Sequence, residues 1–426
     1  WVFVPFYSRS MVYTMPEFLE RRYNPQSRTI LSVISLVSYV LTKVAVTVYA
    51  GGLVFQQVFG IKELWGIDFF WIAAIGLVVL TALYTIFGGM KSVLYTSVLQ
   101  TPILLLGSLI ILVLGFKELG GWDEMMRVCG AVTVNDYGDT MTNLIRSNDD
   151  ANFPWLGALI GSAIIGFWYW CTDQFIVQRV LSGKNEKEAR RGTIFGAYLK
   201  LLPVFLFLIP GMIAFALHQK YIGAGGEGFL PMLANGTANA DAAFPTLVAK
   251  LLPAGVKGLV VCGILAALMS SLASLFNSSA MLFTIDFYKR FRPETPEKKL
   301  VGIGQIATVV IVILGILWIP IMRSVGDVLY TYLQDVQSVL APGIAAAFLL
   351  GICWKRTSAQ GGMWGLIAGM IIGLTRLGAK VYYSNAGEVA DSTFKYLFYD
   401  MNWLFFCGWM FLFCIIVVIV VSLATK

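Results

Sequence analysis

The chain is organised around residues 155–181, which read WLGALIGSAIIGFWYWCTDQFIVQRVL. The stretch begins as a membrane helix does, with an apolar run in which glycines permit close packing. Three polar residues, Thr172, Asp173 and Gln174, then follow an aromatic cluster before the apolar run resumes. Because a carboxylate inside a membrane span is costly, we expect Asp173 to face protein, water or a ligand rather than lipid.

Two interpretations of this stretch are open from its own residues. Glycines and mid-helix polar groups suit a discontinuous helix, whose freed backbone groups can line a binding cavity. Alternatively, residues 155–181 form a single helix whose polar side chains only join it to its neighbours. The stretch supports both equally, and the rest of the sequence favours a binding site.

The composition is that of a polytopic membrane protein, since 58% of the residues are hydrophobic and only 13% are charged. Five of the six cysteines lie in apolar runs and Cys129 stands alone in a loop, which does not suggest a disulfide framework. The single histidine, His218, lies at the end of an apolar run, which argues against histidine-based catalysis and a His/Cys zinc site. We therefore do not expect an enzyme.

About ten apolar runs are each long enough to cross a bilayer. They cover residues 30–58, 67–87, 92–116, 155–181, 193–217, 255–285, 301–321, 327–352, 362–379 and 403–423. The first seven residues resemble the last turns of a helix already under way, so we expect N-terminal helices of the protein to precede this chain. Residues 1–426 are predicted to form a single transmembrane domain.

Basic residues mark every second loop between these runs. They are Arg9, Arg21, Arg22 and Arg28, then Lys91, then Lys184, Lys187, Arg190 and Arg191, then Lys289, Arg290, Arg292, Lys298 and Lys299, then Lys355 and Arg356. By the positive-inside rule these loops are cytoplasmic. The formal net charge of +7 is therefore a topology signal rather than a sign of nucleic-acid binding. Asn235-Gly236-Thr237 fits a glycosylation acceptor in an outer loop, a tripeptide that is common by chance.

Lys200 is a candidate ligand-binding side chain. It lies nine residues past Arg191, hence about 14 Å along a helix into the bilayer. Pro203 and Pro210 can bend this helix and free carbonyl groups. The lysine either donates hydrogen bonds into a polar cavity or snorkels back to the cytoplasmic interface.

Gln334 and Asp335 lie about 10 Å from the outer end of the run 327–352. A glutamine amide offers both a donor and an acceptor, which suits a hydroxyl-bearing ligand, although contacts between helices are the alternative. Further on, Ala341-Pro342-Gly343 is expected to interrupt the helix.

Ser270 and Ser271 lie past the middle of the run 255–285. Hydroxyl and carbonyl oxygens are neutral ligands that hard cations accept. On spacing alone, however, small residues in a membrane helix more often indicate tight helix packing.

Taken together, these residues resemble the sodium–solute symporter family, and most closely its sodium–sugar cotransporter branch. The strongest motifs are TMPEF at 14–18, GGMK at 88–91, WYWCTDQ at 168–174 with Gln178-Arg179, and SSLAS at 270–274 with Asn277-Ser278. The resemblance covers nearly the whole chain. It implies an all-α LeuT-type inverted-repeat fold that holds substrate at mid-membrane beside two broken helices.

The resemblance also implies roles for particular residues. Tyr169 matches an inner-gate tyrosine that stacks on the sugar ring, with Trp170 beside it. Lys200 and Gln334 match side chains that hydrogen-bond sugar hydroxyls, and Tyr330 falls where relatives carry an outer-gate aromatic. The residues that match the sodium (Na+) site are Ala267, through its carbonyl, Ser270 and Ser271.

Two positions depart from the family pattern. Many sugar-transporting relatives have an acid where Ser97 stands, and some place a polar residue at the position of Gly166. The family's first broken helix is expected to precede this chain and to carry further sodium and sugar ligands. With a serine at 97, one sodium per sugar is expected.

The predicted function is therefore sodium-coupled symport of a hexose, glucose or galactose, across the plasma (inner) membrane by alternating access. One alternative keeps the fold and changes the cargo to an inositol, sialic acid or amino acid; Lys200 with Gln334 favours a polyol. A membrane sensor or channel is the other alternative. The sequence contains no ring-forming filter repeat and no sizeable soluble output domain.

Overall fold

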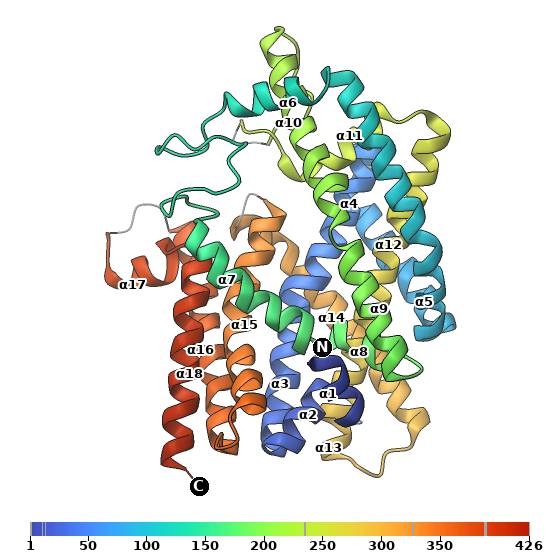
Figure 1. Cartoon of the computed structure of the whole chain (residues 1–426). Helices are drawn as coiled ribbons and strands as arrows, with labels where there is room; N and C mark the ends of the chain where they lie inside the picture. Colours follow the sequence, from blue (N-terminus) through green and yellow to red (C-terminus); the bar gives the residue numbers. More distant parts are fainter. Residues whose placement is uncertain are drawn as a thin grey trace. The chain divides into compact units, whose positions relative to one another are not determined.

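The computed structural model of the chain describes residues 2–10, 12, 14–233, 236–325, 328–386 and 390–425, with the backbone alone for 84, 86–94, 96 and 323–325. Helices make up nearly all of its regular structure (Figure 1). Within the described residues, nine helical segments are long and apolar enough to cross a membrane, and Phe69–Leu83 is a shorter apolar one. The predicted class, a helical multi-span membrane protein, is confirmed. Asn235 lies outside the described residues.

The chain divides into two compact units, each assembled from segments that are distant in sequence. Unit 1 contains Trp1–Val46, Asn148–Ile194 and Leu275–Lys426, and unit 2 contains Thr47–Ser147 and Phe195–Ser274. Neither unit could be excised as one continuous stretch. The single domain expected over residues 1–426 stays a prediction.

Unit 1 contains most of the helices. They are α1 (Phe3–Ser10), α2 (Met15–Arg22), α3 (Pro25–Ser38), the π-helix η1 (Tyr39–Val44), α7 (Trp155–Phe167), the π-helix η2 (Trp168–Thr172), α8 (Gln174–Leu181), the π-helix η5 (Leu282–Tyr288), α13 (Lys289–Phe291), α14 (Glu297–Val325), α15 (Leu329–Cys353), α16 (Ala359–Asn385), α17 (Thr393–Lys395), the π-helix η6 (Tyr396–Asp400) and α18 (Trp403–Ala424).

Unit 2 contains a short hairpin and the remaining helices. They are β1 (Glu63–Leu64), β2 (Ile67–Asp68), α5 (Phe69–Leu119), α6 (Trp122–Gly130), the π-helix η3 (Val204–Leu208), α10 (Ile209–Gly223), the 3-10 helix η4 (Ala240–Ala242) and α11 (Ala243–Leu251). Three helices, α4 (Ala45–Phe59), α9 (Glu186–Leu199) and α12 (Ala254–Met281), run from one unit into the other.

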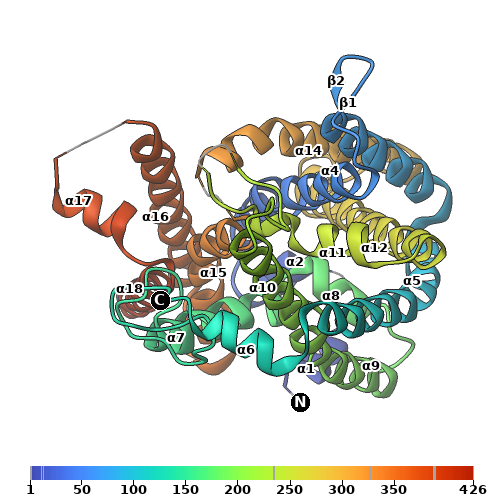
Figure 2. The same ribbon diagram turned by 90° about the horizontal axis from the view of Figure 1, so that it is seen from above.

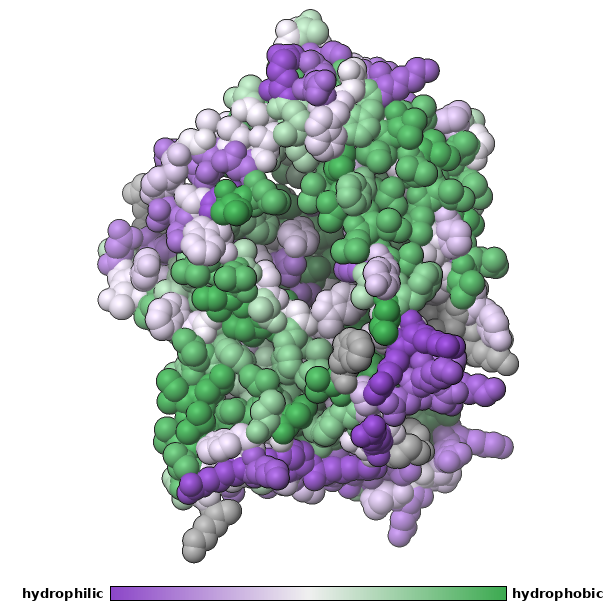
Figure 3. Space-filling model, viewed as in Figure 1, coloured by the Kyte–Doolittle hydropathy of each residue, from purple (hydrophilic) through white to green (hydrophobic). Residues whose placement is uncertain are grey.

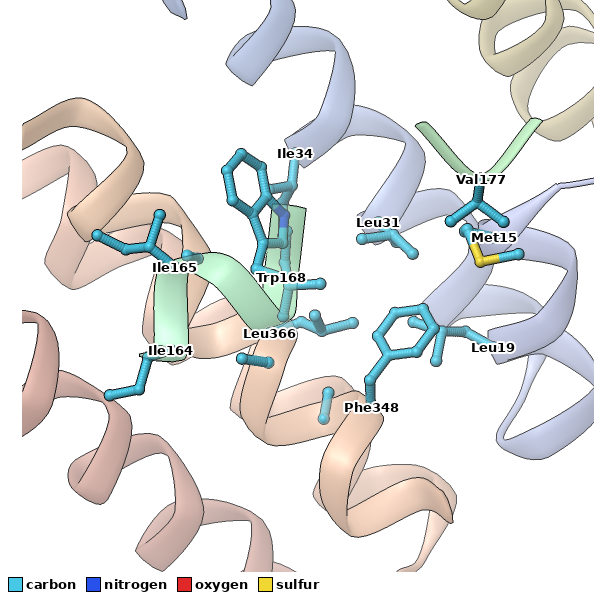
Figure 4. Close-up of a cluster of buried hydrophobic side chains, with 14 of the residues drawn as sticks. Met15, Leu19, Leu31, Ile34, Ile164, Ile165, Trp168, Val177, Phe348 and Leu366 are labelled. Atoms are coloured by element: carbon cyan, nitrogen blue, oxygen red, sulfur yellow. The ribbon is translucent and has the colours of Figure 1, made fainter. Parts of the chain in front are cut away.

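The centre of unit 1 is α15, which packs against α7, α16 and α18, as both ribbon views show (Figures 1 and 2). Glycines allow α15 and α16 to approach closely: a Cβ built on Gly369 would lie 2.7 Å from the Cα of Gly343. A buried apolar cluster extends from α15 to α2, α3 and η2, where Trp168 lies beside Ile34 and Phe348 lies near Leu19 (Figure 4). The close approach of the α15 and α16 backbones at Gly343 and Gly369 is typical of membrane helix pairs.

The surface of unit 1 is apolar where helices face outward. Green residues cover α16 and α18 in Figure 3, and hydrophilic residues gather beyond the helix ends. The exposed apolar residues include Trp364, Ile371, Leu374, Trp409, Leu412, Phe413, Ile416, Val420 and Leu423. Such a surface suits contact with lipid chains.

Three local predictions were wrong. The predicted loop at Lys91 is absent, since the backbone of α5 is helical throughout its 51 residues. Pro342 does not interrupt α15, because neighbouring helices and nearby side chains make a proline tolerable inside a membrane helix. Cys129 lies buried in α6 rather than alone in a loop. All six cysteines are free thiols.

The close approach of α15 and α16 is tested by two Gly→Ala variants. Gly369→Ala forces the helices apart and is expected to cost about 1–3 kcal/mol of stability. Gly378→Ala, on the same helix, meets no described atom within 4 Å and should keep or raise stability through helix propensity. The measurement is the thermal unfolding midpoint in detergent. Equal midpoints for the two variants would contradict the packing.

Candidate functional site

The central span of the sequence is broken at Asp173. Helix α7 continues into the π-helix η2, which ends where Asp173 adopts an extended conformation with φ −78° and ψ 123°. Helix α8 then begins at Gln174, and the Asp173 carboxylate caps it by accepting from the Phe175 amide at 3.1 Å. The discontinuous-helix interpretation is therefore confirmed, and the single-helix alternative is wrong.

Two partners from η1 neutralise the carboxylate at the break. Asp173 is only 5% exposed, and its Oδ2 forms an ion pair with the Lys43 ammonium. The Tyr39 hydroxyl donates to Oδ1 at 3.0 Å and accepts from the Phe175 amide at 3.0 Å. A charge buried at membrane depth persists only when it is paired. The position of the break therefore depends on Lys43 and Tyr39.

The same lysine lies among the aromatic rings of the predicted gate. Its Nζ is 4.4 Å from the ring centroid of Phe175, 4.5 Å from that of Tyr39 and 5.5 Å from that of Tyr169. These distances allow cation–π attraction. The Tyr169 ring in turn lies edge-on to Trp170, with centroids 5.0 Å apart. The Lys43–Asp173 pair and Tyr169, the predicted gate tyrosine, thus form one contiguous group.

The N-terminal helices also bond to the break. The Tyr7 hydroxyl donates to the carbonyl of Cys171 at 2.8 Å, and the amide of Met15 donates to Oε1 of Gln174 at 2.8 Å. Breaking a helix frees backbone groups that need partners in an apolar medium. Helix α1 supplies such a partner for the Cys171 carbonyl, and the Gln174 side chain in turn accepts from the first residue of α2.

Gln334 and Tyr330 lie one turn apart on α15. The Gln334 amide donates to the Tyr330 hydroxyl at 2.8 Å, and Tyr330 is 54% exposed. Its ring centroid is 6.4 Å from that of Phe153, an aromatic that the sequence analysis missed. Asp335 instead forms an ion pair with Lys380 of α16. The structure thus connects Gln334 to Tyr330 by a hydrogen bond. Their helix, α15, packs directly against η2.

Lys200 belongs to unit 2, which is described separately from Tyr169 and Gln334. Helix α9 ends at Leu199 and the chain turns at Lys200, shortly before Pro203 and the π-helix η3. The regular α-helix is thus interrupted before Pro203, whereas Pro210 lies in the first turn of α10. The Lys200 side chain is exposed.

In unit 2, α12 carries Ala267, Ser270 and Ser271 on neighbouring turns. The hydroxyl of Ser270 lies 2.7 Å from that of Ser97 on α5, within hydrogen-bond distance. The structure therefore places Ser97, the position expected to depart from the family pattern, directly beside Ser270, one of the predicted cation ligands. No group of three or more His, Cys, Asp or Glu that could hold a metal occurs among the described residues.

The signal for Lys43 was present in the sequence. A lysine inside the apolar run 30–58 is as costly as Asp173 and requires a partner. The two are 130 positions apart, so spacing could not pair them. Gly166, on α7 before the break, has open space: a Cβ there would meet no described atom within 4 Å.

A multi-span helical protein whose central span breaks at a buried charge has the architecture of a secondary transporter. The chain belongs to the Sodium:solute symporter family, whose profile matches residues 1–369. The predicted resemblance is confirmed, and because this is a family of transporters, so is the expectation that the chain is not an enzyme.

Named relatives support the assignment. The chain is 38% identical over 443 residues to the sodium/glucose cotransporter 1 of Ovis aries, covering 100% of this chain and 66% of the relative. It is 38% identical over 437 residues to the sodium/mannose cotransporter of Bos taurus, covering 100% of this chain and 72% of the relative. Against the human sodium/myo-inositol cotransporter 2 it is 37% identical over 389 residues, with 88% and 57% covered. The chain thus spans about two thirds or less of the sheep and human relatives.

A solved structure shares the fold. It is the substrate-bound outward-open state of a Na+-coupled sialic acid symporter, with a TM-score of 0.72 over 100% of this chain and 80% of that one. The sequence identity is 21%, so the likeness concerns the fold alone. The predicted LeuT-type transporter fold is confirmed.

The charge pair at the break is tested by removing one or both partners. Lys43→Met leaves the Asp173 carboxylate buried without a cation, which is expected to cost about 3–5 kcal/mol of stability. The double variant Lys43→Met/Asp173→Asn removes both charges and should recover much of the loss. The thermal unfolding midpoint in detergent measures both. If the double variant were as unstable as Lys43→Met, the loss of stability would not come from an unpaired Asp173 carboxylate.

Proposed function

We propose that the protein is a sodium-coupled symporter of a hexose-type sugar, glucose or galactose, and works by alternating access in the plasma (inner) membrane. The observation that carries the proposal is the break at Asp173, which ends a half-helix at the aromatic pair Tyr169 and Trp170. Sugar recognition requires an aromatic face for the ring and polar partners for the hydroxyls, because unpaired buried polar groups are costly.

Each sugar ligand has a distinct role in this proposal. Tyr169 stacks on the ring and closes the inward path, with Trp170 beside it. The Gln334 amide donates to one hydroxyl and accepts from another, and the Lys200 ammonium donates. Tyr330, whose ring lies near Phe153, covers the outward path. Closing one path while the other opens gives alternating access.

Sodium is bound by the carbonyl of Ala267 and the hydroxyls of Ser270 and Ser271 in this proposal. Neutral oxygens are the ligands that a hard monovalent cation accepts. Sodium binding stabilises the sugar-competent arrangement, so coupling is a free energy shared between two sites. Each charge that moves inward gains about 2.3 kcal/mol per 100 mV of membrane potential.

A ligand screen tests the cargo. The named relatives transport glucose, mannose or myo-inositol by their descriptions, which supports a polyol over an amino acid. We expect glucose or galactose to raise the thermal unfolding midpoint in sodium and not in potassium. A ligand at 100 times its Kd stabilises by about 2.7 kcal/mol. Stabilisation by inositol, sialic acid or an amino acid instead would reassign the cargo.

The same assay locates the sugar ligands. At a fixed sugar concentration, Gln334→Ala and Lys200→Ala should each reduce the sugar-induced shift while the protein still inserts, because sugar hydroxyls then lack partners in a dry site. Gln305→Ala, an exposed glutamine on α14, is the matched control and should keep the shift. Normal sugar shifts in both site variants would show that these residues do not bind the sugar.

The neutral pair Ser97–Ser270 predicts one sodium per sugar. A carboxylate at 97 would add a full negative charge beside Ser270, whereas Asp173 already pairs with Lys43. In proteoliposomes, a tenfold sugar gradient should shift the reversal potential by about 59 mV for one sodium and about 30 mV for two. We expect about 59 mV for the wild type and for Ser97→Asn, and a shift toward 30 mV for Ser97→Asp. A wild-type shift of 30 mV would contradict the single-site account.

A further inference from the structure

A second charged network lies in unit 1, outside the site described above. Asp335 of α15 forms an ion pair with Lys380 of α16. Arg376, one turn before Lys380, has a fully buried side chain, and its Nη2 lies 3.6 Å from Oδ1 of Asp335. Charged side chains within membrane helices are rare and usually functional. This network of one acid and two bases therefore requires an explanation.

Arg376 connects α15 to the segment that precedes α18. Its Nη1 donates to the carbonyl of Leu397 at 3.3 Å, and its Nη2 donates to that of Met401 at 2.7 Å. Its Cζ lies 4.1 Å from the ring centroid of Phe406 on α18. A guanidinium offers five donors in a rigid fork, so one side chain restrains the π-helix η6, the start of α18 and Asp335 together.

The network fixes the rotation of α15 about its axis. Asp335 directly follows Gln334, and successive side chains on a helix point about 100° apart. Holding Asp335 toward α16 therefore directs Gln334 to a different face, where it donates to the hydroxyl of the half-exposed Tyr330. Buried ion pairs contribute little net stability and are best attested as devices that fix register.

We propose that Asp335 and Lys380 are positioning residues for Gln334, and that through its orientation they set the affinity for the hydroxyl-bearing substrate. This inference rests on the proposed role of Gln334 as a sugar ligand. A merely structural role would reduce the amount of folded protein and the maximal rate. A positioning role raises the apparent substrate constant and acts only while Gln334 is present.

A double-mutant cycle between Asp335 and Gln334 separates these roles. Sodium-driven sugar uptake is measured in proteoliposomes for the wild type, Asp335→Asn, Gln334→Ala and the double variant, with half-saturating concentration and maximal rate determined separately. We expect Asp335→Asn to raise the half-saturating sugar concentration about tenfold, and to add less than about twofold in the Gln334→Ala background.

Lys380 provides a second arm if Asp335→Asn folds poorly. Lys380→Gln removes the ion pair and should raise the half-saturating concentration, whereas Lys380→Arg keeps the charge and should restore it. Additive effects of Asp335→Asn and Gln334→Ala would overturn the inference while leaving the sugar contact of Gln334 intact. A Gln334→Ala protein with unchanged affinity would overturn both the proposed contact and this inference.

Discussion

The arrangement of unit 1 depends on one electrostatic constraint, the need to pair the Asp173 carboxylate at membrane depth. An unpaired charge there would be energetically prohibitive. Lys43 of η1 forms an ion pair with the carboxylate, and the Tyr39 hydroxyl donates a hydrogen bond to it. Asp173 can then end the π-helix η2 and cap α8. Tyr169, the proposed gate tyrosine, precedes this point by four residues and lies within cation–π distance of Lys43. A single ion pair thus sets where the span breaks and which aromatic rings surround the break.

The polar chemistry of the two units differs. Two of the buried carboxylates of unit 1, Asp173 and Asp335, are each paired with a lysine from a distant segment and each lie close in sequence to a proposed sugar ligand. The predicted cation site of unit 2 carries neutral hydroxyls, with Ser270 beside Ser97. Charged pairs with fixed geometry suit the positioning of side chains. Neutral oxygens suit an ion that must be released as well as bound.

The sequence predicted the class, the fold and the location of the break. It could not predict which charged residues pair when they are far apart in sequence. The energetic cost of Asp173 in an apolar run could be inferred from the sequence. Its partner Lys43 could not be identified, because it lies 130 positions away. The interruption predicted at Pro342 failed because a membrane helix with buried neighbours tolerates a proline. The role of Ser97 came from a resemblance, and only the folded chain showed its hydroxyl beside Ser270. Gln334 was identified by its amide chemistry, but the network that orients it requires α16 and α18 in place.

In the proposed function, this scaffold carries a hexose across the membrane together with sodium. Counterflow of labelled glucose or galactose in proteoliposomes tests it most directly, because exchange through the site requires both gates to open in turn. We expect labelled sugar to accumulate above equilibrium in liposomes preloaded with unlabelled sugar, in sodium and not in potassium. Binding of labelled sugar without counterflow would contradict the account and indicate a sensor rather than a transporter.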